Sequence, residues 1–161
     1  AAVIGSDVEV VQNNLALIYD RLGMARESAA AVERAVAINP ENLDAMNNLM
    51  ILYGKLGRHD DALKTAEKIL RADPANAKAY AGLGGVYVSM RQLAPAGEAF
   101  SWAVALNPND YYSLANLGSV YAETGRLDLA QEAWIRALSI NPNLPQVREN
   151  LARLKATRSL R

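Results

Sequence analysis

The sequence predicts an all-α fold in which helical hairpins of equal length stack side by side into a solenoid. Two observations lead to this prediction. An Asx-Pro pair recurs every 34 residues, at Asn39-Pro40, Asp73-Pro74, Asn107-Pro108 and Asn141-Pro142. A tyrosine and a leucine recur with the same step, at Tyr19, Tyr53, Tyr87 and Tyr121 and at Leu15, Leu49, Leu83 and Leu117. Because independent series share one period, the chain contains four copies of one structural unit.

Each unit has the pattern of two amphipathic helices joined by a turn. In the last unit the first helix covers residues 111–124 and ends at Gly125, and the second begins near Leu127 and ends before the sequence INPN. The Asx-Pro pair stops the second helix, because the residue before proline is driven out of the α region. Polar residues placed to cap the next helix follow each pair, at Asn42, Asn76 and Asp110.

At the N-terminus, Ser6 and Glu9 fit a capping box, so we expect the first helix to begin there. Gly118 poses a separate question, because glycine inside a helix costs about 1 kcal/mol relative to alanine. It recurs in phase with Gly84, and small residues recur on the second helices at Ser28, Ala62, Ala96 and Ala130. We therefore predict that small residues let the two helices of a unit approach closely, beside the large side chains of Phe100, Tyr121 and Trp134.

These units resemble the tetratricopeptide repeat (TPR) family, whose loose signature combines Leu-Gly, tyrosine, glycine, alanine, an aromatic residue and proline at fixed positions. The fourth unit matches with Leu114, Leu117, Gly118, Tyr121, Gly125, Ala130, Trp134, Ala137 and Pro142, and the third with Tyr80, Leu83, Gly84, Tyr87, Ala96, Phe100, Ala103 and Pro108. The chain departs from the signature at Gln12, Met50, Ala66 and Arg91, the last standing where glycine is expected.

The resemblance implies a right-handed α-solenoid of four helix-turn-helix repeats plus a C-terminal capping helix. Its boundaries are residues 1–8 for a lead-in and helix cap, 9–42, 43–76, 77–110 and 111–144 for the repeats, and 145–161 for the capping helix. The tail after Pro145 holds five basic residues and one acidic residue. We interpret it as a solvated cap rather than as a basic docking surface.

Composition argues against several function classes. Lys plus Arg and Asp plus Glu both number 17, so the net charge gives no case for nucleic acid or for an anionic membrane, and no apolar run is long enough for membrane insertion. Cysteine is absent and His59 is the only histidine, which argues against a metal site. GLGGVY, residues 82–87, follows no strand, so it is no phosphate loop. We expect no catalytic residue, no cofactor and no metal ligand, while zero cysteines are compatible with a cytoplasmic, a periplasmic or a secreted location.

The resemblance places the first helix of every unit along a concave groove, with side chains that packing within the unit does not need. Paired asparagines beside aliphatic residues occupy these positions in the first two units, and small residues in the last two. The predicted peptide-binding groove consists of Asn13, Asn14, Leu17, Asn47, Asn48, Ile51, Lys78, Ala81, Gly85, Val88, Tyr112, Ala115, Asn116 and Ser119. The small residues either make room for a bulky apolar group or are simply tolerated on an exposed helix.

Asn14, Asn48 and Asn116 resemble the asparagine ladder with which O-GlcNAc transferase repeats hold a peptide backbone, although Gly82 interrupts the series. The alternative is that these asparagines bond within the stack. The carboxylate clamp that TPR co-chaperones use is matched at only two of five positions, by Asn48 and Lys78, while Asn13, Leu17 and Gly82 do not fit.

The function that follows is a non-catalytic protein–protein interaction scaffold, which binds a peptide or helix of a partner in the concave groove. Two alternatives remain open at this point. The chain could be the substrate-recognition or targeting segment of a larger enzyme such as a glycosyltransferase. It could also be a structural subunit that self-associates head to tail through the solenoid ends.

Overall fold

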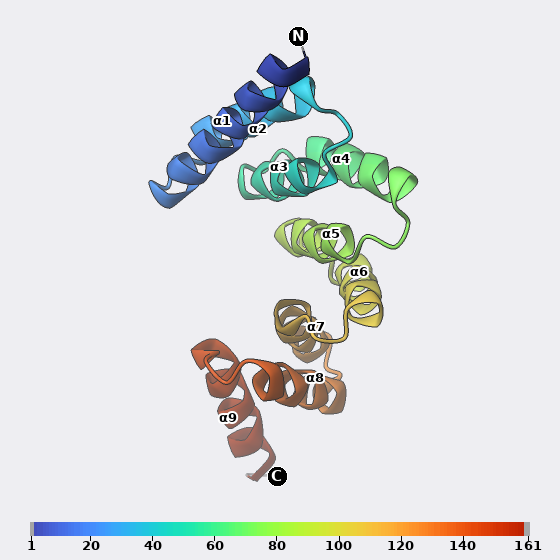
Figure 1. The fold of residues 1–161 in the computed structure, drawn as a ribbon. Coiled ribbons are helices and arrows are strands. Elements are labelled where there is room, and N and C mark those ends of the chain that lie inside the picture. The colour runs from blue at the N-terminus through green and yellow to red at the C-terminus, as the bar shows by residue number, and fades with distance from the viewer. Residues whose placement is uncertain (1, 160–161) are drawn as a thin grey trace.

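A computed structural model describes the backbone of residues 2–159 and the side chains of residues 8–157. Over these residues the chain is all-α, as predicted (Figure 1). The helices are α1 (Ala2–Arg21), α2 (Ala25–Ile38), α3 (Leu43–Lys55), α4 (His59–Ala72), α5 (Ala77–Ser89), α6 (Leu93–Leu106), α7 (Tyr111–Glu123), α8 (Leu127–Ile140) and α9 (Pro145–Ser159).

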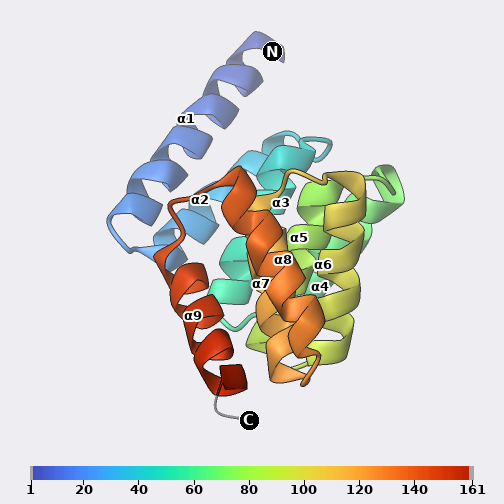
Figure 2. The ribbon, with the colours of Figure 1, turned by 90° about the horizontal axis from the view of Figure 1, so that it is seen from below.

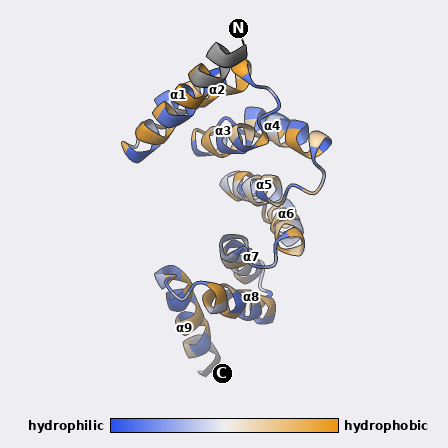
Figure 3. Cartoon of the chain, in the orientation of Figure 1, coloured by the Kyte–Doolittle hydropathy of each residue, from blue (hydrophilic) through white to orange (hydrophobic). Residues whose placement is uncertain are grey.

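The helices pair in chain order and the pairs stack into a solenoid. Helices α1 and α2, α3 and α4, α5 and α6, and α7 and α8 form hairpins, and α9 packs on α8. Figure 1 places α1, α3, α5 and α7 along one side of the stack and the two termini at opposite ends, and Figure 2 shows the stack from below. Hydrophilic and hydrophobic residues share each of the helices α1 to α4, as amphipathic helices require (Figure 3).

The predicted caps of the internal hairpins are confirmed. Asn42 Oδ1 accepts the Ala45 N–H at 2.9 Å, and Asn76 Oδ1 accepts the Ala79 N–H at 3.0 Å. Asp110 Oδ1 accepts the N–H groups of residues 112 and 113 at 3.0 and 3.2 Å. Each cap satisfies a backbone donor that the first turn of a helix leaves unpaired, so the helices after the first three Asx-Pro turns start where the sequence predicts.

The prediction of a separate lead-in capped by Ser6 is wrong for the backbone. Helix α1 already includes Ala2 and runs without interruption through Ser6 to Arg21. No proline stands before Ser6, so the backbone can continue as a helix through Gly5, even though glycine has a low helix propensity. Residue 1 lies outside the described part.

Close packing explains the glycine in the middle of α7. A Cβ atom on Gly118 would lie 2.5 Å from both Cδ1 and Nε1 of Trp134, and one on Gly84 would lie 2.7 Å from the ring of Phe100. The Trp134 ring is held there because its Nε1–H donates to the carbonyl oxygen of Ala115 at 3.1 Å. In the third and fourth hairpins, the first and second helix therefore pack through an aromatic ring seated on a glycine, as predicted.

Candidate functional site: the concave groove

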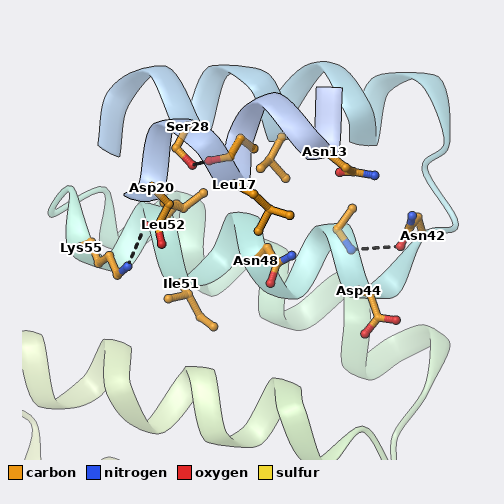
Figure 4. A pocket seen from close by; sticks show the side chains of 13 residues that line it. Asn13, Leu17, Asp20, Ser28, Asn42, Asp44, Asn48, Ile51, Leu52 and Lys55 are labelled. Carbon is orange, nitrogen blue, oxygen red and sulfur yellow. Dashed lines mark hydrogen bonds and ion pairs between the residues drawn. The ribbon is translucent and has the colours of Figure 1, made fainter. Parts of the chain in front are cut away.

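The inner face of the stack holds a groove of about 790 Å³ that crosses α3, α5 and the start of α7. Seven of the predicted groove residues line it, namely Asn47, Asn48, Ile51, Lys78, Ala81, Gly85 and Tyr112. A second cavity, of about 270 Å³, lies between α1 and α3 and is lined by Asn13, Leu17, Asn48 and Ile51 among others (Figure 4). Because Asn48 and Ile51 line both, the two hollows meet along α3.

Two glycines set the spacing of the inner helices. Helix α3 packs directly on α5, where a Cβ on Gly54 would lie 3.1 Å from Cγ2 of Val86 and a Cβ on Gly82 would collide with the methyl group of Met50. One repeat earlier, Asp20 and Asn48 stand at the corresponding positions between α1 and α3. Their side chains line the cavity that separates those helices. Gly82 interrupts the asparagine series for a packing reason, since it receives Met50.

The cavity between α1 and α3 combines one apolar side with polar ends. Leu17 points from α1 into the space above Asn48, and Ile51 lies at its open edge (Figure 4). Lys55 Nζ on α3 pairs with Asp20 Oδ1 on α1 at 3.2 Å, which closes one end. Both members of that pair are more than half exposed, so the pair adds no more than about 1 kcal/mol to stability.

The predicted asparagines divide into free and bonded groups. The side chains of Asn13, Asn14 and Asn48 make no hydrogen bond within the described part of the chain, and the last two are exposed. Asn116 is different, because its Nδ2 donates to the carbonyl oxygen of Tyr112 at 2.9 Å within its own helix. Asn14 and Asn48 of the ladder therefore have unengaged amides, and Asn48 lines both hollows of the inner face.

Asn47 corrects the expectation that this whole set of positions is free for a ligand. It is buried, and its Nδ2 donates to the carbonyl oxygen of Leu43 at 2.9 Å and to Asn76 Oδ1 at 3.3 Å. Asn47 thus ties α3 to the cap of α5. Its Oδ1 is buried with no hydrogen-bond partner among the described residues, although Asn47 lines the groove.

The remaining predicted residues lie towards the C-terminal end of the inner face. A Cβ atom on Gly85 would have no neighbour within 4 Å, so α5 shows bare backbone to the groove, with exposed Val88 three residues on. Tyr112 is exposed at the groove end. Asn14, Val88, Ala115, Asn116 and Ser119 lie on inner helices but outside the residues lining the two hollows.

Sequence comparison agrees with this architecture. Residues 21–83 and residues 103–132 match family models described as tetratricopeptide repeat, and together these segments cover more than half of the chain. The chain belongs to the tetratricopeptide repeat family. No curated protein sequence matches it.

Solved TPR structures have the same fold. A thermophilic TPR protein of Thermus thermophilus is 26% identical, with 92% of this chain and 82% of that chain covered and a TM-score of 0.81. PilF of Pseudomonas aeruginosa is 22% identical, with 96% and 71% covered and a TM-score of 0.85. The first TPR of Spaghetti (RPAP3), solved with the HSP90 peptide SRMEEVD, is 22% identical, with 74% and 94% covered and a TM-score of 0.69.

The electrostatics of this TPR groove are balanced. Lys78 Nζ on α5 lies 2.7 Å from Asp44 Oδ1 on α3, with both side chains mostly exposed. Asp44 and Lys78 are 34 residues apart, so the period places them at equivalent positions of adjacent repeats, although their opposite charges are particular to these two repeats. The pair of Lys55 with Asp20 joins positions that are not equivalent, and the period does not predict it. Lys55, Ser89, Asn107 and Asp110 also line the groove and were missed by sequence reasoning.

Two structural features that would indicate other functions are absent from the described residues. In the part of the chain that the structure describes, no three His, Asp or Glu side chains are placed to hold a metal ion. No helix among these residues is both long and apolar enough to cross a membrane. The tetratricopeptide repeat is a repeat domain that is typically non-catalytic, and no catalytic family matches the chain.

Proposed function

We propose that this TPR chain is a non-catalytic scaffold whose concave groove binds a peptide or helix of a partner protein. The observation that carries the proposal is the coincidence of unengaged amides and exposed apolar side chains on one face. Asn48 has no hydrogen-bond partner among the described residues, and it lies between Leu17 and Ile51, which are both exposed. An inner wall that needed no partner would gain nothing from exposing these groups.

The chemistry of the wall suits a peptide chain. A primary amide has two donors and an acceptor, so Asn14 and Asn48 can each pair with a backbone N–H and C=O. Leu17, Ile51, Val88 and Tyr112 are exposed and would contact side chains of the ligand. Full burial of one such leucine or isoleucine contributes about 1.5–3 kcal/mol.

Charge contributes little to recognition in this proposal. The solved complex of the RPAP3 repeat with an HSP90 peptide is an example of peptide binding by this fold. In the present chain Leu17 and Gly82 stand where the carboxylate-clamp pattern has asparagine and arginine. We therefore expect ligands chosen by their apolar side chains, with affinity that does not need a free C-terminal carboxylate.

The resemblance to O-GlcNAc transferase repeats supports the second candidate less well. A substrate-recognition segment of a larger glycosyltransferase would use a continuous asparagine ladder. Here Gly82 accommodates Met50 and Asn116 bonds within α7, which leaves Asn14 and Asn48. We therefore place the interaction scaffold first.

The test is selection of peptides from a random display library against the full chain, followed by fluorescence anisotropy with the selected peptides. Asn48→Ala combined with Ile51→Ala should weaken binding about tenfold or more, because one apolar anchor and one backbone clamp are removed. Ile135→Ala is the matched control, since Ile135 on α8 is exposed to a similar degree (47% against 42% for Ile51) and lines neither hollow. Peptides that bind the double variant as tightly as the unaltered chain would contradict the proposal.

A further inference from the structure

Helix α1 carries the residues of an interface between repeats, but nothing in the described chain covers them. Val11 and Ile18 are 59% and 54% exposed. Their counterparts in every later first-type helix are buried against the preceding repeat. These are Ala45 3%, Leu52 5%, Ala79 0%, Val86 2%, Ser113 0%, Val120 2%, Val147 6% and Leu154 8%. The two exposed positions in α1 have nonetheless kept large apolar side chains.

The apolar surface on α1 extends beyond these two residues. Val8, Val11, Leu15 and Ile18 of α1, followed by Leu22 in the turn, are spaced alternately by three and four residues, which is the spacing of a stripe that packs against one neighbouring helix. All of them except half-buried Leu15 are exposed, Leu22 to 66%. A contiguous apolar stripe of this kind marks an interaction site. Figure 1 shows that α1 stands at the end of the stack with no helix beyond it.

The later repeats show what kind of helix fits this stripe. The counterparts of Val11 and Ile18 lie where α3 packs on α2, α5 on α4, α7 on α6 and α9 on α8. In each case the covering element is the second helix of the preceding hairpin. The complement of the open stripe on α1 is therefore a helix of the second type.

Helix α8 is the last helix of this type, and α9 covers it. Val147 and Leu154 of α9 are buried in a cluster with Ala130 and Trp134 of α8. In register, Val147, Leu151 and Leu154 of α9 correspond to Val11, Leu15 and Ile18 of α1. The two helices thus carry nearly identical apolar triplets, one seated on α8 and the other exposed at Val11 and Ile18, with Leu15 half-buried.

The outer side of α9 is unsuited to receive α1 directly. Arg148, Glu149, Arg153 and Lys155 are exposed on it, and no large exposed apolar residue accompanies them in the described part of the helix. Simple stacking of an intact C-terminal end on α1 would bury these charges. Head-to-tail contact requires α9 to leave α8.

We propose that α1 of one copy docks on α8 of a second copy in place of α9, so that the chain assembles head to tail and α9 is the built-in cap that prevents it. Replacing Val147, Leu151 and Leu154 of α9 by Val11, Leu15 and Ile18 of α1 preserves the apolar contact with α8. Helix α1 docks already packed on α2, whereas α9 packs chiefly on α8. The cap is favoured at low concentration because it is tethered, with an effective concentration in the millimolar range. This assembly uses the ends of the solenoid and is independent of the proposed groove function.

The experiment compares four chains by sedimentation velocity from micromolar to millimolar concentration. The first is the unaltered chain. The second carries Leu154→Ser, which weakens the packing of α9 on α8, and the third carries Val11→Lys with Ile18→Lys, which places charges on the exposed stripe of α1. The fourth carries all three substitutions. We expect Leu154→Ser to reach about twice the monomer mass or more as concentration rises. The unaltered chain at micromolar concentration and the triple variant at all concentrations should remain monomeric. Leu154→Ala serves as a milder variant if Leu154→Ser loses helical content by circular dichroism.

Three outcomes would overturn the proposal. The first is a folded Leu154 variant that stays monomeric although trypsin cleaves its α9 faster than in the unaltered chain. The second is an oligomer that persists after Val11→Lys and Ile18→Lys. The third is a dimer of the unaltered chain that depends on Val11 and Ile18 but not on Leu154, which would indicate that α1 pairs with α1 of a second copy.

Discussion

At the scale of single residues, glycines in this chain have opposite reasons for being inside helices. The Cα atom of Gly118 lies under the Trp134 ring, and a methyl group there would meet Cδ1 and Nε1 at 2.5 Å. Gly85 has open space on the groove side. The helix-propensity cost is the same for both, about 1 kcal/mol relative to alanine. Only at Gly118 does packing compensate for this cost, because the Trp134 ring occupies the space that a Cβ atom would need.

The two glycines therefore give a matched pair of substitutions. Gly118→Ala should lower the free energy of unfolding by about 1–3 kcal/mol, because the added methyl group overpacks against a buried ring that Ala115 holds in place. Gly85→Ala should raise it by about 1 kcal/mol, because helix propensity is gained without a clash. Urea denaturation followed by circular dichroism measures both. An equal effect of the two substitutions would show that the Trp134 contact is not what requires glycine.

Tyr53 provides a pH-dependent contribution to stability. Its hydroxyl donates to Glu33 Oε1 at 2.9 Å, and the Arg58 guanidinium lies 4.2 Å from the ring centroid. Burial, together with the hydrogen bond and the charge of Glu33, raises the pKa of Tyr53 from 10.0 to about 12. The folded state thus disfavours the ionised form. The stabilisation is complete below pH 10 and is lost as the pH rises through 12.

Stability measured across this interval should reveal that loss. The free energy of unfolding should fall by roughly 2 kcal/mol between pH 10 and 12 on account of Tyr53. In Tyr53→Phe this share of the decrease should be missing, whereas Tyr112→Phe, at an exposed tyrosine, should retain it. Thermal denaturation at closely spaced pH values makes the comparison. Identical pH profiles for Tyr53→Phe and the unaltered chain would refute the assignment.

At the scale of elements, the turn between the two helices of a hairpin is the most constrained segment. Gly23, Gly57 and Gly125 adopt φ angles of 72°, 72° and 76° in this turn, and Arg91 adopts 60° at the equivalent position of the third repeat. The left-handed conformation costs a residue with a side chain about 1–2 kcal/mol, and glycine adopts it without that penalty.

Arg91→Gly should therefore stabilise the chain. We expect a gain of about 0.5–1 kcal/mol, smaller than the full strain because glycine also increases the entropy of the unfolded chain. The reciprocal substitution Gly57→Arg should cost about 1–2 kcal/mol, since a Cβ there meets no atom within 4 Å and only backbone strain changes. Chemical denaturation of both variants decides the point, and a loss of stability in Arg91→Gly would count against it.

The sequence predicts these elements well because their signals are local. The caps at Asn42, Asn76 and Asp110 and the Asx-Pro stops each depend on a few consecutive residues. The start of α1 is mispredicted because Ser6 and Glu9 satisfy a capping pattern that the preceding helix-compatible residues override. A local pattern permits a helix end but does not enforce it.

The groove is predicted less completely because its shape depends on contacts between repeats. The period places Asn47 and Asn48 together on the inner side, yet one is buried against the cap of α5 and the other is exposed. Helix α3 lies against α5 where Gly54 faces Val86 and Gly82 faces Met50. Between α1 and α3, the side chains of Asp20 and Asn48 at the corresponding positions line a cavity instead. Pairings across repeats of this kind cannot be read from any single repeat.

At the scale of the whole molecule, the stack behaves as a one-dimensional chain of hairpins. Contacts run between a hairpin and its immediate neighbours, and α1 and α9 each have a neighbour on one side only within the described residues. Stability in such an array is the sum of terms for each hairpin and each interface. A substitution that destabilises one hairpin is therefore expected to promote unfolding of that hairpin and its neighbours before it affects the opposite end of the stack.

Hydrogen exchange can measure this locality. In the unaltered chain, amides of α3 to α7 should exchange most slowly and those of α1 and α9 fastest, because the terminal helices lack a second interface. Gly118→Ala should then accelerate exchange in α7, α8 and α9 by about tenfold for every 1.4 kcal/mol lost, with a much smaller change in α1 and α2. Gly85→Ala is the control that adds a methyl group without a clash. Equal acceleration along the entire chain would mean that the repeats unfold as one unit. In that case α9 could not leave α8 while the rest of the chain stays folded. The proposed assembly through α8, which requires that step, would then also be excluded.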